Sequence, residues 1–348
     1  MIVKSAAELT ALTTRILLAA GATPDNARGV AEHLVLANLS GVDSHGVWHV
    51  KGYVEHIQDG QLDPAARPGV VKETPASVQV SGNWTFGHIA ARYAMERAIE
   101  KSAEHNVAIA GLVQSHHIGR LGHYVEMAAE KGMISMVFLG GQGNKNPTAV
   151  PFGGRGRIMH TNPLAMGFPA GEDPPMFFDY ATSTVAGVKV VNAHRRQEEL
   201  PPGCIVDEAG NPSTDPDDFF NGGSHVAFGG HKGYALMLAV DYLGRIFAGA
   251  DHFVDENRGG IYDRYAGTLM VVFKADLFQP FADYARAADE MGRRTRRTPP
   301  APGFDEVLVP GDLEERARRT RRRDGIPIED DVWETIRQAA ASVGIEEI

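Results

Sequence analysis

Segments that read as strands and segments that read as helices alternate between residues 70 and 145. Residues 77–82 alternate apolar and polar side chains, as a half-exposed strand does, whereas residues 88–106 repeat apolar side chains at helical spacing. Runs of small and branched residues at 106–114 and 133–141 predict buried strands, on either side of a second helical segment at 121–132. Chains that alternate in this way pack helices against a sheet, so the sequence predicts an α/β body.

The regions on either side of this body have different patterns. The first 60 residues read as helices: Ser5 and Glu8 form a capping box, Pro24 suits the first position of a second helix, and Ser44 is placed to cap a third. We expect three parts, namely a helical N-terminal region, an α/β body and a C-terminal extension packed with the first part, over residues 1–69, 70–274 and 275–348.

The second half of the body is rich in loops. Residues 146–260 are enriched in Gly, Pro, Asn and Asp, and long ordered loops of this kind are often functional. Short strand-like runs occur at 176–181 and 188–193. Residues 233–250 are apolar nearly all round and predict a buried helix, and residues 268–278 predict a strand.

Composition narrows the class of protein. The net charge of −10 should repel nucleic acid and anionic membranes, so we expect neither as a partner. The one cysteine, Cys204, excludes an internal disulfide and fits a reducing compartment. The N-terminus does not resemble a signal peptide, and no apolar run reaches the roughly 18 residues of a membrane span. These features predict a cytoplasmic protein.

Several common motifs are missing from the sequence. A dinucleotide fingerprint would read G-x-G-x-x-G, but Asn146 occupies the third glycine position after Gly141 and Gly143. Neighbouring His116 and His117 lack a carboxylate at ligand spacing, so we expect no metal. Arginines concentrate between residues 293 and 323, but acidic residues are interleaved with them, which favours a solvated helix face over a site for polyanions.

Four polar segments each follow an apolar element: DSHG at 43–46, SHHIGRLGHY at 115–124, a long segment from HTNP to FDYATS at 160–183, and FGGHKGY at 228–234. Binding groups commonly occupy such loops on a rigid scaffold. Together the segments contribute histidines, an aspartate, a lysine and hydroxyl groups. This set of side chains suits proton transfer beside an anionic ligand.

These segments, in this order, resemble the type-2 malate/L-lactate dehydrogenase family, which also contains sulfolactate, ureidoglycolate and hydroxycarboxylate dehydrogenases and piperideine-2-carboxylate reductases. The resemblance extends from about residue 5 to residue 340. The matching motifs are D-S-H-G at 43–46 with Tyr53, H-x-G-R-L-G-x-Y at 117–124, P-F-G-G at 151–154, T-N-P at 161–163, D-x-A-T-S at 179–183, G-G-H-K-G-Y at 229–234, P-G-D at 310–312 and G-I-P at 325–327.

The resemblance implies a fold and an activity. The fold would be a non-Rossmann dinucleotide-binding fold with a mixed, largely antiparallel sheet flanked by helices, which would explain the missing fingerprint. The activity would be NAD- or NADP-dependent hydride transfer to or from a small 2-hydroxy or 2-keto acid, in a homodimer. Two alternatives remain open: a reductase of a cyclic 2-imino acid, and a non-catalytic protein that binds a dinucleotide or metabolite.

The resemblance also assigns roles to residues. His45 is the proton donor in some similar proteins and His117 in others, and Asp179 would orient the catalytic histidine. Substrate would meet Ser44, His49 and Arg120. The expected cofactor-binding residues are Thr161, Asn162, Phe178, Asp179, Tyr180, Ala181, Thr182, Ser183, His231, Lys232, Pro310, Gly311 and Asp312.

His49 departs from the family pattern, which has arginine at this position. Arginine can hold a carboxylate through two parallel hydrogen bonds, and histidine cannot copy that geometry. A protonated His49 would add positive charge, so we expect its contribution to substrate binding to rise as the pH falls toward about 6. Arg120, three residues after His117 in a glycine-containing turn, is the alternative cation for the substrate carboxylate.

Overall fold

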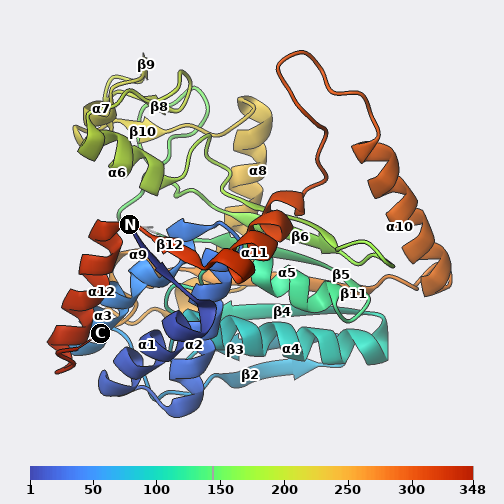
Figure 1. The fold of residues 1–348 in the computed structure, drawn as a ribbon, viewed down its shortest axis with the longest axis horizontal. Helices are drawn as coiled ribbons and strands as arrows, with labels where there is room; N and C mark the ends of the chain where they lie inside the picture. The colour runs from blue at the N-terminus through green and yellow to red at the C-terminus, as the bar shows by residue number, and fades with distance from the viewer. Residues whose placement is uncertain (143–144, 348) are drawn as a thin grey trace.

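A seven-stranded sheet forms the centre of the molecule in a computed structural model that describes residues 1–142 and 145–347 (Figure 1). Only β3 and β4 pair in parallel, and the other neighbours are antiparallel. This confirms the expected mixed, largely antiparallel sheet. In spatial order the strands are β2 (Gly69–Thr74), β3 (Ser77–Ser81), β4 (Val107–Val113), β11 (Gly267–Lys274), β5 (Met133–Gly140), β6 (Leu164–Phe168) and β7 (Met176–Tyr180).

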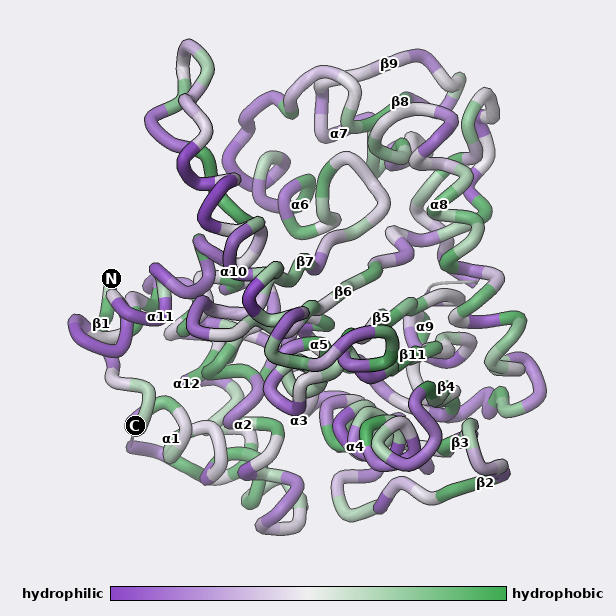
Figure 2. Tube along the Cα trace, turned by 90° about the vertical axis from the view of Figure 1, so that its right-hand side faces the viewer, coloured by the Kyte–Doolittle hydropathy of each residue, from purple (hydrophilic) through white to green (hydrophobic). Residues whose placement is uncertain are grey.

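Helices cover both faces of this sheet, because apolar side chains of the central strands point to both sides. Along β11, Met270 and Val272 join the core beneath α4 (Gly87–His105) and α5 (Gly122–Ala129). Leu269 points the other way and packs with α8 (His231–Asp241). Since successive side chains of a strand alternate between faces, a central strand covered on both sides is apolar throughout. Figure 2 shows this hydrophobic colouring along β5 and β6.

The N-terminal helices share a core with the end of the chain. They are α1 (Ala6–Ala19), α2 (Pro24–Leu39) and α3 (Val50–Gln58), and they pack with α12 (Asp330–Ser342). Strand β1 (Ile2–Lys4) pairs with β12 (Ile326–Ile328). The capping box of Ser5 and Glu8 is confirmed, and so is the helix start at Pro24. The division into three parts stays a prediction.

One short segment has a different structure from the predicted one. Residues 188–193 read as a strand, but they lie in helix α6 (Gly187–Arg196). Val190 and Ala193, three residues apart, face a small core with Ile205, which helical spacing permits and strand spacing does not. The elements around α6 are α7 (Pro216–Phe220) and a small sheet of β8 (Ile205–Val206), β9 (Pro212–Ser213) and β10 (Ser224–His225).

The segment 233–250 is helical as predicted, but it is not fully buried. Helix α8 continues into a π-helical turn, Tyr242–Phe247, that contacts β5 and β11 on one side only. Tyr242 and Phe247 are 57% and 66% exposed on the other side. The expectation of a buried helix was therefore wrong for this turn, because apolar composition does not show which side is covered.

The C-terminal arginines pair with acidic groups, as expected for a balanced helix face. In α11 (Asp312–Asp324), Arg318 binds Glu126 of α5 and Arg321 binds Asp43. Figure 2 shows hydrophilic residues along α11 and α10 (Phe281–Arg296). In the described residues, no helix is both long enough and apolar enough to cross a membrane.

Candidate active site

The DSHG segment forms two tight turns between α2 and α3, namely 3₁₀ turns at Asp43–His45 and Val47–His49. Asn38 holds them: its Oδ1 accepts from the backbone N–H of Val47 at 2.9 Å, and its Nδ2 donates to Asp43 at 2.6 Å. A Cβ at Gly46 would lie 2.3 Å from Asn38 Oδ1, so only glycine fits there. The turn is thus fixed to the end of α2.

Ser44 does not cap the third helix, contrary to the prediction. Helix α3 begins five residues after His45, and His49 precedes it without a side-chain cap. The Ser44 hydroxyl instead lies 3.0 Å from His45 Nδ1. The two turns therefore separate His45 from the start of α3.

The loop after β4 brings His117 beside this turn. His33 Nε2 accepts from the backbone N–H of Arg120 at 3.1 Å, which fixes the loop to α2. Gly119 has a φ of +70°, and a Cβ there would lie 2.6 Å from His33 Nε2. The loop therefore needs a glycine both for its backbone conformation and for its close contact with α2.

Three histidine rings and a tyrosine form the centre of the site. The ring of His117 lies 5.9 Å from that of His45 and 4.6 Å from that of His49, between centroids. The Tyr53 hydroxyl is 2.7 Å from His117 Nδ1 and 3.4 Å from His88 Nε2. The structure thus brings together predicted residues from two segments that are 70 residues apart in the chain.

Asp179 completes the predicted catalytic group. It lies in β7, and its Oδ2 accepts from the backbone N–H of Gly122 at 2.8 Å. Burial lowers the pKa of His45, and the charge of Asp179 raises it in part. Burial likewise raises the pKa of Asp179, while Gly122 and His45 lower it. Each group therefore favours the charged form of the other, although no hydrogen bond or ion pair joins them directly in the described residues.

His117 and His49 have no such counter-ion. Burial and the neighbouring His49 and His45 hold the pKa of His117 well below its usual range. Burial, with His45, lowers the pKa of His49 to about 3, although a hydrogen bond to Ser44 opposes this. The expectation that His49 becomes protonated near pH 6 was therefore wrong, because the effect of burial outweighs that of the hydrogen bond to Ser44.

Arg120 is buried next to this group, with 2% of its surface exposed. Its Nη1 donates to Glu126 at 2.8 Å, and Arg318 reaches the same carboxylate at 2.6 Å. Nη2 is buried without a hydrogen-bond partner among the described residues. A Cβ at Gly122 would lie 2.8 Å from Nη2, so this N–H group is on the same side as the backbone that binds Asp179.

The segment after Asp179 leads to the glycine turn before α8. Thr182 donates from its backbone N–H to Thr161 at 2.8 Å and from its hydroxyl to the carbonyl of Asn162 at 3.0 Å. The carbonyl of Thr182 accepts from the N–H of Phe228 at 3.0 Å. Thr161, Asn162 and Thr182 therefore lie together, and Ser183 continues this contact to Ala227.

Helix α8 begins with exposed polar groups. Gly229 and Gly230 both have a φ of +61°, and His231 and Lys232 follow in the first turn. Both side chains are exposed, and Lys232 has no hydrogen bond or ion pair within the described parts of the chain. A lysine is unfavourable at the positive end of a helix, so its presence suits an anionic ligand. Asn162 Oδ1 is also buried without a partner.

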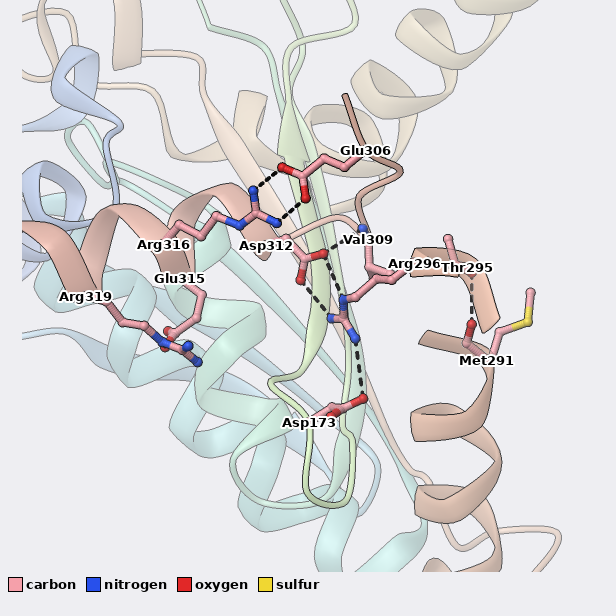
Figure 3. Close-up of polar contacts among 10 residues, drawn as sticks. All are labelled: Asp173, Met291, Thr295, Arg296, Glu306, Val309, Asp312, Glu315, Arg316 and Arg319. Atoms are coloured by element: carbon pink, nitrogen blue, oxygen red, sulfur yellow. Dashed lines mark hydrogen bonds and ion pairs between the residues drawn. The ribbon is translucent and has the colours of Figure 1, made fainter. Parts of the chain in front are cut away.

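The segment Pro310–Asp312 lies beside β7, where the carbonyl of Pro310 accepts from the N–H of Phe177 at 3.4 Å. Figure 3 shows that the Asp312 carboxylate binds Arg296, at 2.7 and 3.0 Å, and the backbone N–H of Val309 at 2.8 Å. Both oxygens are therefore engaged within the chain. Gly311, with a φ of +99°, contacts the Phe177 ring.

A second buried group lies next to the predicted one. His56 Nδ1 is 2.6 Å from His116 Nε2, and His116 Nδ1 is 3.6 Å from Asp263 Oδ2. Asp263, at the end of α9 (Gly260–Asp263), also accepts from Gln142 at 3.2 Å and from the backbone N–H of His117. Sequence reasoning missed this arrangement, since nothing in the spacing connects residues 56 and 263.

Two cavities, of about 530 and 550 Å³, lie away from these residues. The first is lined by the end of α5, the start of β5 and Phe281, and the second by α1 with Arg28 and Glu32. Neither is lined by a histidine or by any of the predicted site residues. In the residues that the structure describes, no cluster of three or more His, Cys, Asp or Glu could hold a metal ion.

Known proteins match this chain over nearly its full length. Hydroxycarboxylate dehydrogenase B of Escherichia coli O157:H7 is 34% identical over 330 residues, which cover 94% of this chain and 90% of that protein. The structure of sulfolactate dehydrogenase from Methanocaldococcus jannaschii aligns with a TM-score of 0.89 at 30% identity, covering 99% of this chain and 98% of that one.

A reductase also has this fold. The structure of delta1-piperideine-2-carboxylate reductase from Pseudomonas syringae aligns with a TM-score of 0.86 at 29% identity, covering 98% of this chain and all of that one. The family described as malate/L-lactate dehydrogenase matches residues 4–337. The chain therefore belongs to the malate/L-lactate dehydrogenase family.

Proposed function

We propose that this protein transfers a hydride between NAD or NADP and carbon 2 of a small 2-hydroxy or 2-keto acid. The observation that carries the proposal is the arrangement of His45 beside Asp179, with a free N–H of the buried Arg120 nearby. This provides a proton donor with a counter-ion and a cation for a carboxylate. Both are needed when a keto acid is reduced.

His45 is the better candidate for the acid–base group. In reduction, its ring N–H gives a proton to the carbonyl oxygen at carbon 2, and in oxidation the ring takes that proton back. Asp179 stabilises the charged ring of His45, whereas the histidines around His117 disfavour its charged form. We assign His117, which the Tyr53 hydroxyl holds at Nδ1, to orienting the carbonyl group through its other nitrogen.

The substrate carboxylate belongs next to Arg120. The unpartnered Nη2 would otherwise remain a buried donor without an acceptor, which costs about 1–3 kcal/mol. A carboxylate there would satisfy it through a charge-assisted hydrogen bond. Ser44, whose hydroxyl lies against His45 Nδ1, can direct a hydrogen bond to the same substrate.

The residues of the cofactor segments fit a dinucleotide. The bound cofactor would supply or accept the hydride at its nicotinamide ring. Three residues of extended chain, about 10 Å, separate Asp179 from Thr182, which bonds to the turn before α8. This spacing supports a role for Lys232 at the cofactor phosphates, with the nicotinamide near His45. Phe178, Tyr180, Ala181 and Ser183 line the connection, and Pro310–Asp312 borders it at β7.

The proposal is tested by mixing the protein with NADH or NADPH and a panel of 2-keto acids, and following the near-ultraviolet absorbance of the reduced nicotinamide. We expect cofactor oxidation that depends on both the protein and the acid. A protein that binds the dinucleotide but oxidises it with no acid in the panel would support a non-catalytic binding role instead.

A second candidate is reduction of a cyclic 2-imino acid. It is favoured by the similarity to delta1-piperideine-2-carboxylate reductase. An imine needs the same proton and the same hydride as a ketone, so His45 and Arg120 would serve both reactions. Delta1-piperideine-2-carboxylate, compared with pyruvate in the same assay, distinguishes the two candidates.

A further inference from the structure

The two ring nitrogens of His49 have different partners. Nε2 lies 3.0 Å from the carbonyl oxygen of Ser44, and the indole N–H of Trp48 donates to the same oxygen at 2.8 Å. A carbonyl oxygen can accept two hydrogen bonds but cannot donate. His49 Nε2 must therefore carry the hydrogen, and the neutral ring has its lone pair on Nδ1.

The ring of His49 stays neutral in the pH range of enzyme assays. Burial and the nearby His45 lower its pKa to about 3. In the described residues, His49 Nδ1 has no hydrogen-bond partner, and the side chain is only partly buried. His49 Nδ1 can therefore accept a hydrogen bond. It can neither donate one nor provide a positive charge.

This acceptor lies within the candidate active site. The ring of His49 stacks on Tyr53, with an interplanar angle of 7° and centroids 5.7 Å apart. The centroid of the His49 ring lies 4.6 Å from that of the His117 ring and 6.3 Å from that of the His45 ring. A small acid held between His45 and Arg120 would therefore have its third carbon or its substituents next to His49.

We propose that His49 determines specificity by accepting a hydrogen bond from a hydroxyl group on the substrate, at the carbon next to the keto group. The substrate class is a 2-keto acid with one carboxylate and a 3-hydroxyl group. A second carboxylate would face the lone pair of Nδ1 and find no positive charge there, so dicarboxylic acids are disfavoured. This inference rests on the proposed function, and it names the substrate class of the same site.

The test compares kcat/KM for pyruvate, 3-hydroxypyruvate and oxaloacetate in the wild type, His49→Phe and Trp48→Phe. Phenylalanine keeps the ring but removes both nitrogens. Trp48→Phe removes the other hydrogen bond to Ser44 and leaves Nδ1 intact, so it controls for loosening of the turn. We expect the wild type and Trp48→Phe to prefer hydroxypyruvate over pyruvate by roughly three- to tenfold, the range of one neutral hydrogen bond. His49→Phe should bring this ratio close to one.

Three results would overturn the inference. One is a wild type that prefers oxaloacetate to both monocarboxylic acids, and another is a ratio of hydroxypyruvate to pyruvate near one. The third is a His49→Phe variant that keeps the wild-type ratio. In all three the protein is active, so the proposed function would stand. Absence of cofactor oxidation with all three acids would instead overturn the proposed function, and the inference with it.

Discussion

At the scale of single residues, Asp263 shows how burial changes the pKa of a side chain in the candidate site. Burial raises the pKa of this carboxyl group to about 7, although Gln142 and the backbone of His117 oppose the shift. Burial, with His56, lowers the pKa of the facing His116 to about 3. Below about pH 7 the pair is therefore mostly neutral, and Asp263 can accept from the His117 backbone without a buried charge.

Asp263→Asn should stabilise the protein above pH 7. The folded-state pKa is raised above the usual value of 3.8, so the stability that Asp263 contributes is present below about pH 4 and is lost as the pH rises to about 7. The full difference corresponds to at most about 4 kcal/mol. Asparagine has no charge to lose. Urea unfolding between pH 5 and pH 8 should show a smaller decline for the variant than for the wild type.

Asp59→Asn is the matched control for this measurement, because Asp59 is exposed at the end of α3. Its stability should follow the wild type across the same pH range. An Asp263→Asn protein that declines as steeply as the wild type would show that Asp263 is ionised in the folded state at all these pH values.

The sequence predicted which residues belong to part of the candidate site, but it could not predict the contacts between these residues. His45, His117 and Asp179 lie in polar segments that follow apolar elements, and the family resemblance was needed to propose their roles. The fixing of His49 to Ser44, and its neutral state, depend on burial by chain segments far away in the sequence. Burial in the folded protein determines these pKa values, and burial cannot be read from the linear order of residues.

At the scale of elements, the start of α8 joins the two halves of the candidate site. Its glycine turn bonds to Thr182, which lies three residues after Asp179. The first turn of a helix has unpaired backbone N–H groups that favour an anion, and Lys232 adds a charge there. In the proposed arrangement, the position of this helix sets the distance between the cofactor phosphates and His45.

Lys232→Ala should weaken binding of NADH or NADPH by about 1.5–3 kcal/mol, because a charged hydrogen bond to phosphate is lost. Titration of nicotinamide fluorescence measures this change. Lys72→Ala is the matched control, since Lys72 is an exposed lysine in the edge strand β2. Equal affinities of the two variants would remove Lys232 from the cofactor site.

Helix α11 is attached to the body through a buried carboxylate. The carboxylate of Glu126 in α5 lies between two arginines. Its Oε2 is 2.8 Å from Arg120 Nη1, and its Oε1 is 2.6 Å from Arg318 Nη1. Burial alone would raise its pKa, but the two arginines hold it below its usual range. Without this carboxylate, two buried guanidinium groups would face one another.

Glu126→Gln should destabilise the protein by about 3 kcal/mol, because removing one member of a buried ion pair leaves its partners without compensation. The matched control is Glu315→Gln, which removes the exposed pair with Arg319, also at 2.8 Å. That change should cost less than about 1 kcal/mol. Similar denaturation midpoints for the two variants would contradict a structural role for the buried network.

Elements were predictable where their pattern was long. Helix α4 and strand β5 follow from spacing alone, because their apolar side chains repeat over many residues. Helix α6 was missed because the three valines and one alanine of residues 188–193 fit both the strand and the helix period, and only the small core around Ile205 decides between them. Ser44 failed as a helix cap because two tight turns intervene.

At the scale of the whole molecule, buried histidines dominate the response to acid. Ten of the 14 histidines have a pKa below the usual value, with burial as the largest cause: His33, His45, His49, His56, His88, His116, His117, His123, His160 and His225. Most lie around the candidate site. Because burial disfavours the charged form of these rings, protonating them reduces the stability of the folded protein.

Unfolding near pH 5.5 should therefore take up several protons. A histidine whose pKa is lowered in the folded state contributes folding stability above about pH 6.5. This contribution is lost as the pH falls toward about 3–4. Calorimetric unfolding in buffers of different ionisation enthalpy measures the uptake. A value near zero at pH 5.5 would show that the histidines are already protonated in the folded protein.

The central claim is that His45, paired with Asp179, exchanges the proton beside the nicotinamide. Its most direct test is the turnover of His45→Asn and His117→Asn, measured together with the affinity of each variant for the dinucleotide. The account predicts that His45→Asn lowers kcat by roughly 100-fold or more, the usual contribution of general acid–base catalysis, and leaves dinucleotide affinity unchanged. His117→Asn should lower kcat less. A mild effect of His45→Asn with a severe effect of His117→Asn would contradict the account and assign the proton to His117.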